Sequence, residues 1–99
     1  NLAFRELFTF RHDPPNLDDS NVVRALRKHL VETIGAYQNC LDKAPPKAAE
    51  DEQFKRLIND SLYYLKRIEL AIDKKSKTDV INILRRVVSS NNLLWLHFG

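Results

Sequence analysis

Apolar side chains recur every three or four residues along most of this 99-residue chain, and this spacing constrains the fold more than any other feature. Between residues 21 and 43 the spacing is unbroken and places one apolar stripe along a single helical face. The stripe comprises Val23, Leu26, Leu30, Ile34, Tyr37 and Leu41. The chain has only two glycines, too few for the many tight turns of a β-sandwich. We therefore predict a helix over residues 21–43, in which Gly35 is expected to let a neighbouring helix approach closely.

A second helix is predicted to start at Lys47 or Asp51 and to end at Lys75, after Ala44-Pro45-Pro46 has ended the first. Acidic residues lead this helix and lysines close it, which matches both ends of the helix dipole. Its apolar face is wide, as a helix inside a bundle requires. The face comprises Phe54, Leu57, Ile58, Ser61, Leu62, Tyr64, Leu65, Ile68 and Ile72.

A third helix is predicted after a short turn at residues 76–79, where serine, threonine and aspartate side chains supply capping groups. The polar residues 89–92 are expected to interrupt this helix before the apolar run 93–96. That run needs cover from the bundle or from a partner. The residues expected to face inward are Val80, Ile81, Leu84, Val87 and Val88.

The N-terminal residues 1–11 are predicted to form a short amphipathic helical segment, because Phe4, Leu7 and Phe8 follow the same spacing. Three of the five phenylalanines lie here, so we expect the segment to lie across the bundle or to insert into a partner. The sequence Asp-Pro-Pro-Asn at 13–16 then forces an extended break.

Short connections between long helices make neighbouring helices antiparallel. We therefore predict an all-α fold, a small up-and-down helical bundle of three main helices plus the short N-terminal helical segment. Residues 1–99 form one domain, with an N-terminal arm and proline-rich link at 1–17 and the bundle at 19–99.

Little in the sequence indicates catalysis or cofactor binding. The histidines His12, His29 and His97 are too far apart in sequence for a helical metal pair, and a zinc site built from distant histidines has no support. Cys40 is expected to be buried by packing, His29 to lie on a solvated face and His97 to lie in the core. Carboxylates at residues 18–19 and 50–52 fall at helix starts, where capping explains them. We expect no enzyme activity, no cofactor and no metal.

The features that remain are basic surfaces. The formal net charge is +3 and the pI is about 9.2, which fits docking on an acidic surface better than wrapping a nucleic acid. No apolar run approaches the roughly 20 residues that a membrane span needs. The basic residues form four groups: Arg24, Arg27 and Lys28; Lys66 and Arg67; Lys74, Lys75 and Lys77; Arg85 and Arg86.

The stretch Leu62-Tyr63-Tyr64-Leu65-Lys66-Arg67-Ile68-Glu69-Leu70-Ala71-Ile72-Asp73-Lys74-Lys75-Ser76 resembles the PsbQ family of extrinsic photosystem II subunits and their PsbQ-like lumenal relatives. Phe4-Arg5-Glu6-Leu7 is similar to the family's N-terminal segment. Residues 23–41 are similar to its basic helix, and Ala44-Pro45-Pro46 to its proline-bearing turn. The resemblance covers most of the chain and is one of spacing and character.

This resemblance implies a non-catalytic subunit in the chloroplast thylakoid lumen, peripheral to the membrane and not spanning it. Such a protein docks on the lumenal face of photosystem II and contacts its core and other extrinsic subunits. It thereby stabilises the oxygen-evolving complex by helping to retain calcium and chloride. The basic groups would steer docking, and Phe4, Phe8 and Phe10 would anchor the bound protein.

Two alternatives stay open. One is a helical adaptor or supernumerary subunit of another large assembly, with residues 93–99 in a partner groove. The other, ranked last, is nucleic-acid binding through the basic groups. The chain contains no methionine, so either a leader has been removed or the chain is the ordered part of a longer protein. A basic bundle with a lumenal character favours a removed targeting leader.

Overall fold

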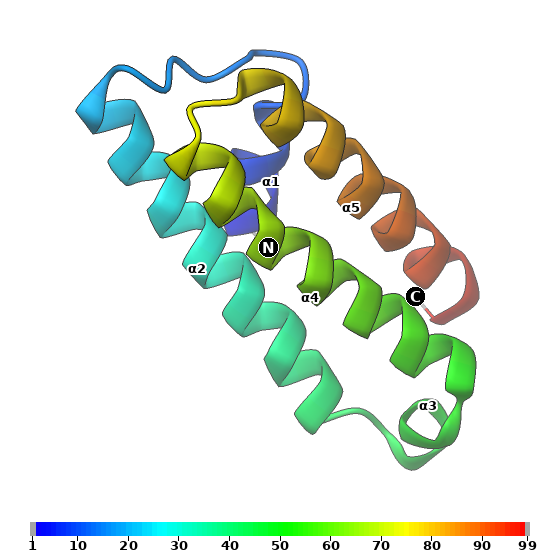
Figure 1. The fold of residues 1–99 in the computed structure, drawn as a ribbon. Coiled ribbons are helices and arrows are strands. Elements are labelled where there is room, and N and C mark those ends of the chain that lie inside the picture. Colours follow the sequence, from blue (N-terminus) through cyan, green and yellow to red (C-terminus); the bar gives the residue numbers. More distant parts are fainter. Residues whose placement is uncertain (1, 99) are drawn as a thin grey trace.

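A computed structural model describes residues 2–98, and over that range the protein is all-helical. The helices are α1 (Leu2–Thr9), α2 (Ser20–Asp42), α3 (Pro46–Glu50), α4 (Glu52–Asp73) and α5 (Lys77–Phe98). The long helices α2, α4 and α5 run antiparallel in turn and form an elongated bundle of 44 × 20 × 19 Å (Figure 1). The predicted up-and-down bundle of three main helices with a short N-terminal helix is confirmed.

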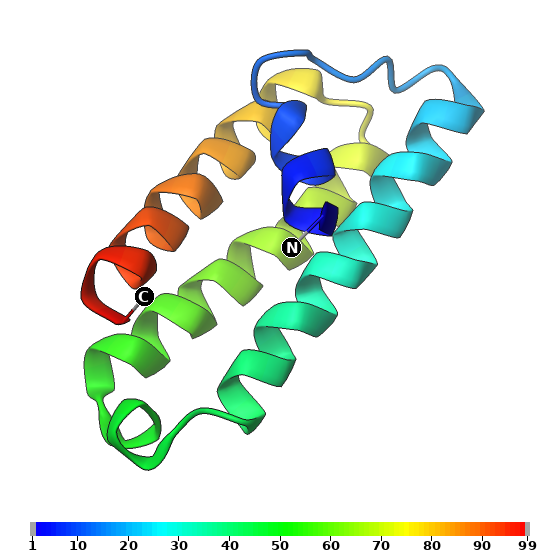
Figure 2. The ribbon, with the colours of Figure 1, turned by 180° about the vertical axis from the view of Figure 1, so that it is seen from behind.

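Helix α4 is the centre of the bundle, with α2 on one side and α5 on the other (Figure 1). The short helix α1 lies over one face, between α2 and α5 (Figure 2). Its Leu7 is fully buried and Phe8 is nearly so, which confirms that the N-terminal segment lies across the bundle. The core residues are Leu7, Phe8, Leu17, Leu26, Leu30, Tyr37, Phe54, Ile58, Leu62, Leu65, Ile68, Ala71, Ile72, Val80, Leu84 and Val87.

Two aspartates start the first two long helices. Asp19 Oδ1 accepts a hydrogen bond from the backbone N–H of Asn21 at 2.9 Å, and Asp51 Oδ1 accepts one from Gln53 at 2.8 Å. Each carboxylate satisfies a backbone donor that the helix itself leaves unpaired. Capping therefore explains these two carboxylates. Asp51 also separates α4 from the short α3, so a separate turn of helix precedes the second long helix.

Helix α5 runs without a break through residues 89–92, so the predicted interruption is wrong. Asn91 is held in place there because its side-chain oxygen accepts a hydrogen bond from the Tyr37 hydroxyl at 2.8 Å. Beyond it, Leu94 packs against the core, whereas Trp95 and Leu96 are 67% and 77% exposed. The bundle therefore covers only part of the apolar run.

Two other packing expectations also fail. Gly35 is exposed, and a Cβ built on it would meet nothing within 4 Å, so it permits no close helix approach. Ile81 is half-buried but lies outside the core cluster of the described residues, and Ile83 packs against that cluster instead. For Ile81 and Ile83 the reason is that apolar spacing marks the buried side of a helix only to within about one residue step of 100°.

The turn that follows α4 contains a strained residue. Lys75 has φ of 55°, in the left-handed region. The Ser76 N–H donates to the Ala71 carbonyl at 2.9 Å and the Lys75 N–H to the Ile72 carbonyl at 3.0 Å, which is a Schellman motif. A side chain at this position costs roughly 1–2 kcal/mol, and glycine avoids that cost.

We expect Lys75→Gly to raise the free energy of unfolding by about 0.5–1 kcal/mol, because relief of backbone strain exceeds the loss of the exposed ion pair to Asp18. Urea unfolding of the variant and of Lys75→Ala measures the difference. The alanine variant keeps the strain and loses the ion pair, so it should not be stabilised. Equal stability of the glycine and alanine variants would contradict the prediction that the backbone at residue 75 is strained.

Candidate functional site

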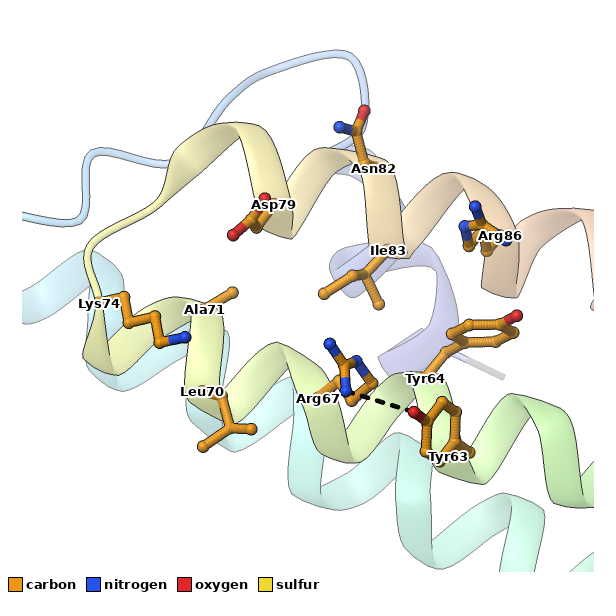
Figure 3. Close-up of a pocket in the computed structure, with 10 residues that line it drawn as sticks. All are labelled: Tyr63, Tyr64, Arg67, Leu70, Ala71, Lys74, Asp79, Asn82, Ile83 and Arg86. Carbon is orange, nitrogen blue, oxygen red and sulfur yellow. Dashed lines mark hydrogen bonds between the residues drawn. The ribbon is translucent and has the colours of Figure 1, made fainter.

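A groove of about 430 Å³ lies between α4 and α5, and it gathers basic residues from both helices (Figure 3). Arg67 comes from α4, Lys74 is the C-cap residue of α4, and Arg86 comes from α5. Among the described residues that line the groove, Asp79 is the single carboxylate. The full lining is Tyr63, Tyr64, Arg67, Leu70, Ala71, Lys74, Asp79, Asn82, Ile83 and Arg86.

Two tyrosines position the two guanidinium groups. The Arg67 guanidinium carbon lies 5.5 Å from the centroid of the Tyr63 ring, and its Nη1 donates to the Tyr63 hydroxyl at 3.2 Å (Figure 3). The Arg86 guanidinium carbon lies 5.7 Å from the centroid of the Tyr64 ring. The two rings meet edge to face, with centroids 5.5 Å apart. Cation–π contacts of this kind orient an arginine without neutralising its charge.

The three cations keep their charge available. Within residues 2–98, neither Arg67 nor Arg86 nor Lys74 makes an ion pair with a carboxylate. Ala71 and Ile83 form an apolar floor between the helices (Figure 3). A weakly hydrated floor lowers the local dielectric constant and so strengthens a charged contact above it. A guanidinium presents parallel N–H groups that match carboxylate or phosphate oxygens. The groove is thus chemically suited to binding an anionic group.

The groove brings together only some of the residues predicted from sequence. Arg67, Lys74 and Arg86 line it. Arg24, Lys28, Lys66, Lys75 and Arg85 are exposed and are not among its lining residues.

Arg27 has a different role from the one predicted, because it joins α2 to α4. Its Nη1 lies 2.6 Å from Glu69 Oε2, and its Nη2 lies 2.7 Å from Asp73 Oδ1. The hydrogen bond that Arg27 donates to Asp73 is the main reason that the Arg27 pKa lies above its ordinary value. A guanidinium occupied by two carboxylates of its own chain is a poor docking group for a partner.

The aromatic residues of the N-terminal arm are turned inward. Phe8 belongs to the core, and Phe10 packs against it. Phe4 stacks on the Tyr37 ring at a centroid distance of 5.1 Å. These rings already bury their apolar faces within the bundle, so the structure does not present Phe4, Phe8 and Phe10 as anchors for a partner.

Three single residues also differ from expectation. Cys40 is exposed, not buried, because it lies beside the buried stripe of α2 and not on it. His97 is exposed rather than in the core. His29 is half-buried, and its Nδ1 is enclosed with no hydrogen-bond partner among the described residues. Within residues 2–98, no cluster of histidine, cysteine and acidic side chains is placed to hold a metal ion.

Sequence reasoning missed Tyr63, Tyr64 and Asn82 as parts of the groove. One signal was present, since Tyr63 and Arg67 are four residues apart and therefore share a helix face. The contact between Tyr64 and Arg86 joins two helices, so no local spacing could reveal it.

Comparison with known proteins found no matching family model, no matching curated protein and no matching solved structure. In the part of the chain described by the structure, no helix has the length and apolar character needed to cross a bilayer.

Proposed function

We propose that this protein is a non-catalytic subunit that docks on an acidic surface of a larger assembly through the α4–α5 groove. The observation that carries this proposal is the convergence of Arg67, Lys74 and Arg86 on one groove, where Asp79 is the single carboxylate among the lining residues that the structure describes. A concave surface with an excess of one charge favours association with the opposite charge and speeds the encounter.

We propose that the assembly is photosystem II and that docking occurs on its lumenal face, in the chloroplast thylakoid. The resemblance of residues 62–76 to the PsbQ family supports this assignment, and that stretch supplies Arg67 and Lys74 to the groove. The helical bundle agrees with it. In this role the protein contacts the photosystem II core and other extrinsic subunits and helps to retain calcium and chloride.

A salt wash tests the proposal. In ~1 M salt the Debye length falls to about 3 Å, so contacts between exposed charges are largely screened. We expect such a wash of thylakoid membranes to release the protein into the supernatant, where mass spectrometry detects it, and low salt to retain it. Calcium and chloride dependence of oxygen evolution should increase in the washed membranes and decrease when the protein is added back. Full retention in high salt counts against electrostatic docking.

A helical adaptor of another assembly is the second candidate, and the exposed end of α5 favours it. Trp95 and Leu96 are mostly exposed there, and apolar contacts hold a partner without charge. The salt wash separates the two functions, because an adaptor held by these side chains stays bound in high salt.

A further inference from the structure

A second groove lies at the other end of the molecule, where α1 does not cover the space between α2 and α5. Helix α1 has 8 residues and α2 has 23, so α1 is too short to cover the whole length of the bundle. It covers the end at which α2 and α5 begin (Figure 2). The remaining groove has a volume of about 410 Å³. It lies between the C-terminal parts of α2 and α5, and its main walls are Phe4, Tyr37, Phe54, Leu94, Trp95 and Phe98.

These walls are mainly aromatic and are fixed by contacts with one another. Phe54 and Phe98 meet edge to face with ring centroids 5.3 Å apart, and Phe4 stacks on Tyr37. Concave sites of 300–1,000 Å³ with apolar walls and a few polar groups are typical of small-molecule binding sites. The volume and the lining of this groove both match that description.

The groove has few polar groups, and two of them are hydrogen-bonded to each other. The Tyr37 hydroxyl donates a hydrogen bond to the Asn91 side-chain oxygen. Because that oxygen is occupied, Asn91 offers its NH2 group as a donor. Lys43, at the end of α2, is the single charged residue among the described residues that line the groove. An apolar groove with a cation in its lining complements a molecule that has an apolar chain and a negative head.

We propose that this groove binds a single-chain amphiphile with an anionic headgroup. The chain lies among the aromatic side chains, and the headgroup pairs with the Lys43 ammonium group. Over the range that the structure describes, the groove shares no lining residue with the α4–α5 groove, so this site goes beyond the docking function and stands or fails separately from it.

The groove contains two natural reporters for a binding experiment. Trp95 is the single tryptophan and Cys40 the single cysteine of the chain, and both line the groove. The probe is sodium laurate, titrated below its micelle concentration into the full chain. We expect a saturable blue shift of Trp95 emission and an at least fivefold slower alkylation of Cys40 by iodoacetamide. Dodecylammonium, with the same chain and the opposite charge, should bind at least tenfold more weakly.

A matched pair of variants tests the role of the headgroup. Lys43→Gln should weaken laurate binding about fivefold and leave binding of uncharged dodecanol unchanged, because only the exposed charge pair is lost. Lys28→Gln removes an exposed charge from the same helix outside the groove and should change neither. Circular dichroism confirms that both variants keep their helices.

Several results would overturn the proposal. They are an unchanged Trp95 emission with laurate, equal binding of laurate and dodecylammonium, or equal effects of the two lysine variants. A Trp95 emission that shifts with protein concentration alone would identify a second copy of the chain as the occupant instead. Loss of docking in the salt wash leaves this test unaffected.

Discussion

Reversing the charge of Arg67 and Arg86 together is expected to weaken docking of the protein on the proposed acidic partner by about 100-fold. Each reversal removes an attraction and adds a repulsion inside one groove, and roughly 1.4 kcal/mol for each corresponds to that factor. Both side chains are exposed, so the bundle should keep its stability. Binding of Arg67→Glu/Arg86→Glu to salt-washed photosystem II membranes at one fixed ionic strength measures the effect.

The matched control is Arg24→Glu/Lys28→Glu. It changes the net charge by the same amount, on exposed residues of α2 that do not line the groove. We expect it to reduce affinity only a few-fold, through the long-range field of the protein. If both double variants lose affinity equally, net charge alone governs binding and the groove is not the docking site.

The stability of the bundle is expected to fall between pH 10 and pH 12 because of Tyr37. Its side chain is almost completely buried, and burial raises its pKa to about 12. In the unfolded chain the pKa is about 10. The neutral phenol therefore contributes its full stability below pH 10, and that contribution is lost as the pH rises through 12. A two-unit difference corresponds to about 2–3 kcal/mol.

Urea unfolding at pH 8, 10 and 11.5 measures this loss, and Tyr37→Phe is the control. The variant has no phenol to ionise at this position, so its stability should change less across the same range. At pH 8 it should be less stable by about 1 kcal/mol, because the hydrogen bond from the hydroxyl to Asn91 is lost. Parallel pH profiles of the two proteins would show that Tyr37 does not govern the alkaline transition.

The geometry of the α4–α5 groove also bears on the kind of partner. Arg67 and Arg86 are each held against a tyrosine ring, so their positions are set before a partner arrives. A preorganised charge loses less side-chain entropy on binding than a mobile one. Two positioned guanidinium groups therefore favour a partner whose carboxylates are themselves fixed, such as a folded acidic surface.

The helices were predictable from sequence because their signals are local. The apolar spacing of 21–43 and 54–72 sets the buried faces, and Asp19 and Asp51 cap the two helices at their expected starts. The continuity of α5 was not predictable. The local propensity of residues 89–92 favours a break in the helix, and a tertiary hydrogen bond at Asn91 opposes that preference. Long-range packing overrides local preference when it satisfies a polar group inside the bundle.

The sequence by itself determined the all-helical class, the order of the helices and an excess of basic residues without a catalytic motif. The tertiary structure alone decided which of those basic residues act together. It pairs Arg27 with two carboxylates, and it brings Arg67 and Arg86 into one groove from separate helices. The physical reason is that helix periodicity is fixed by near neighbours, whereas the environment of a charge depends on the rotation of each helix within the bundle.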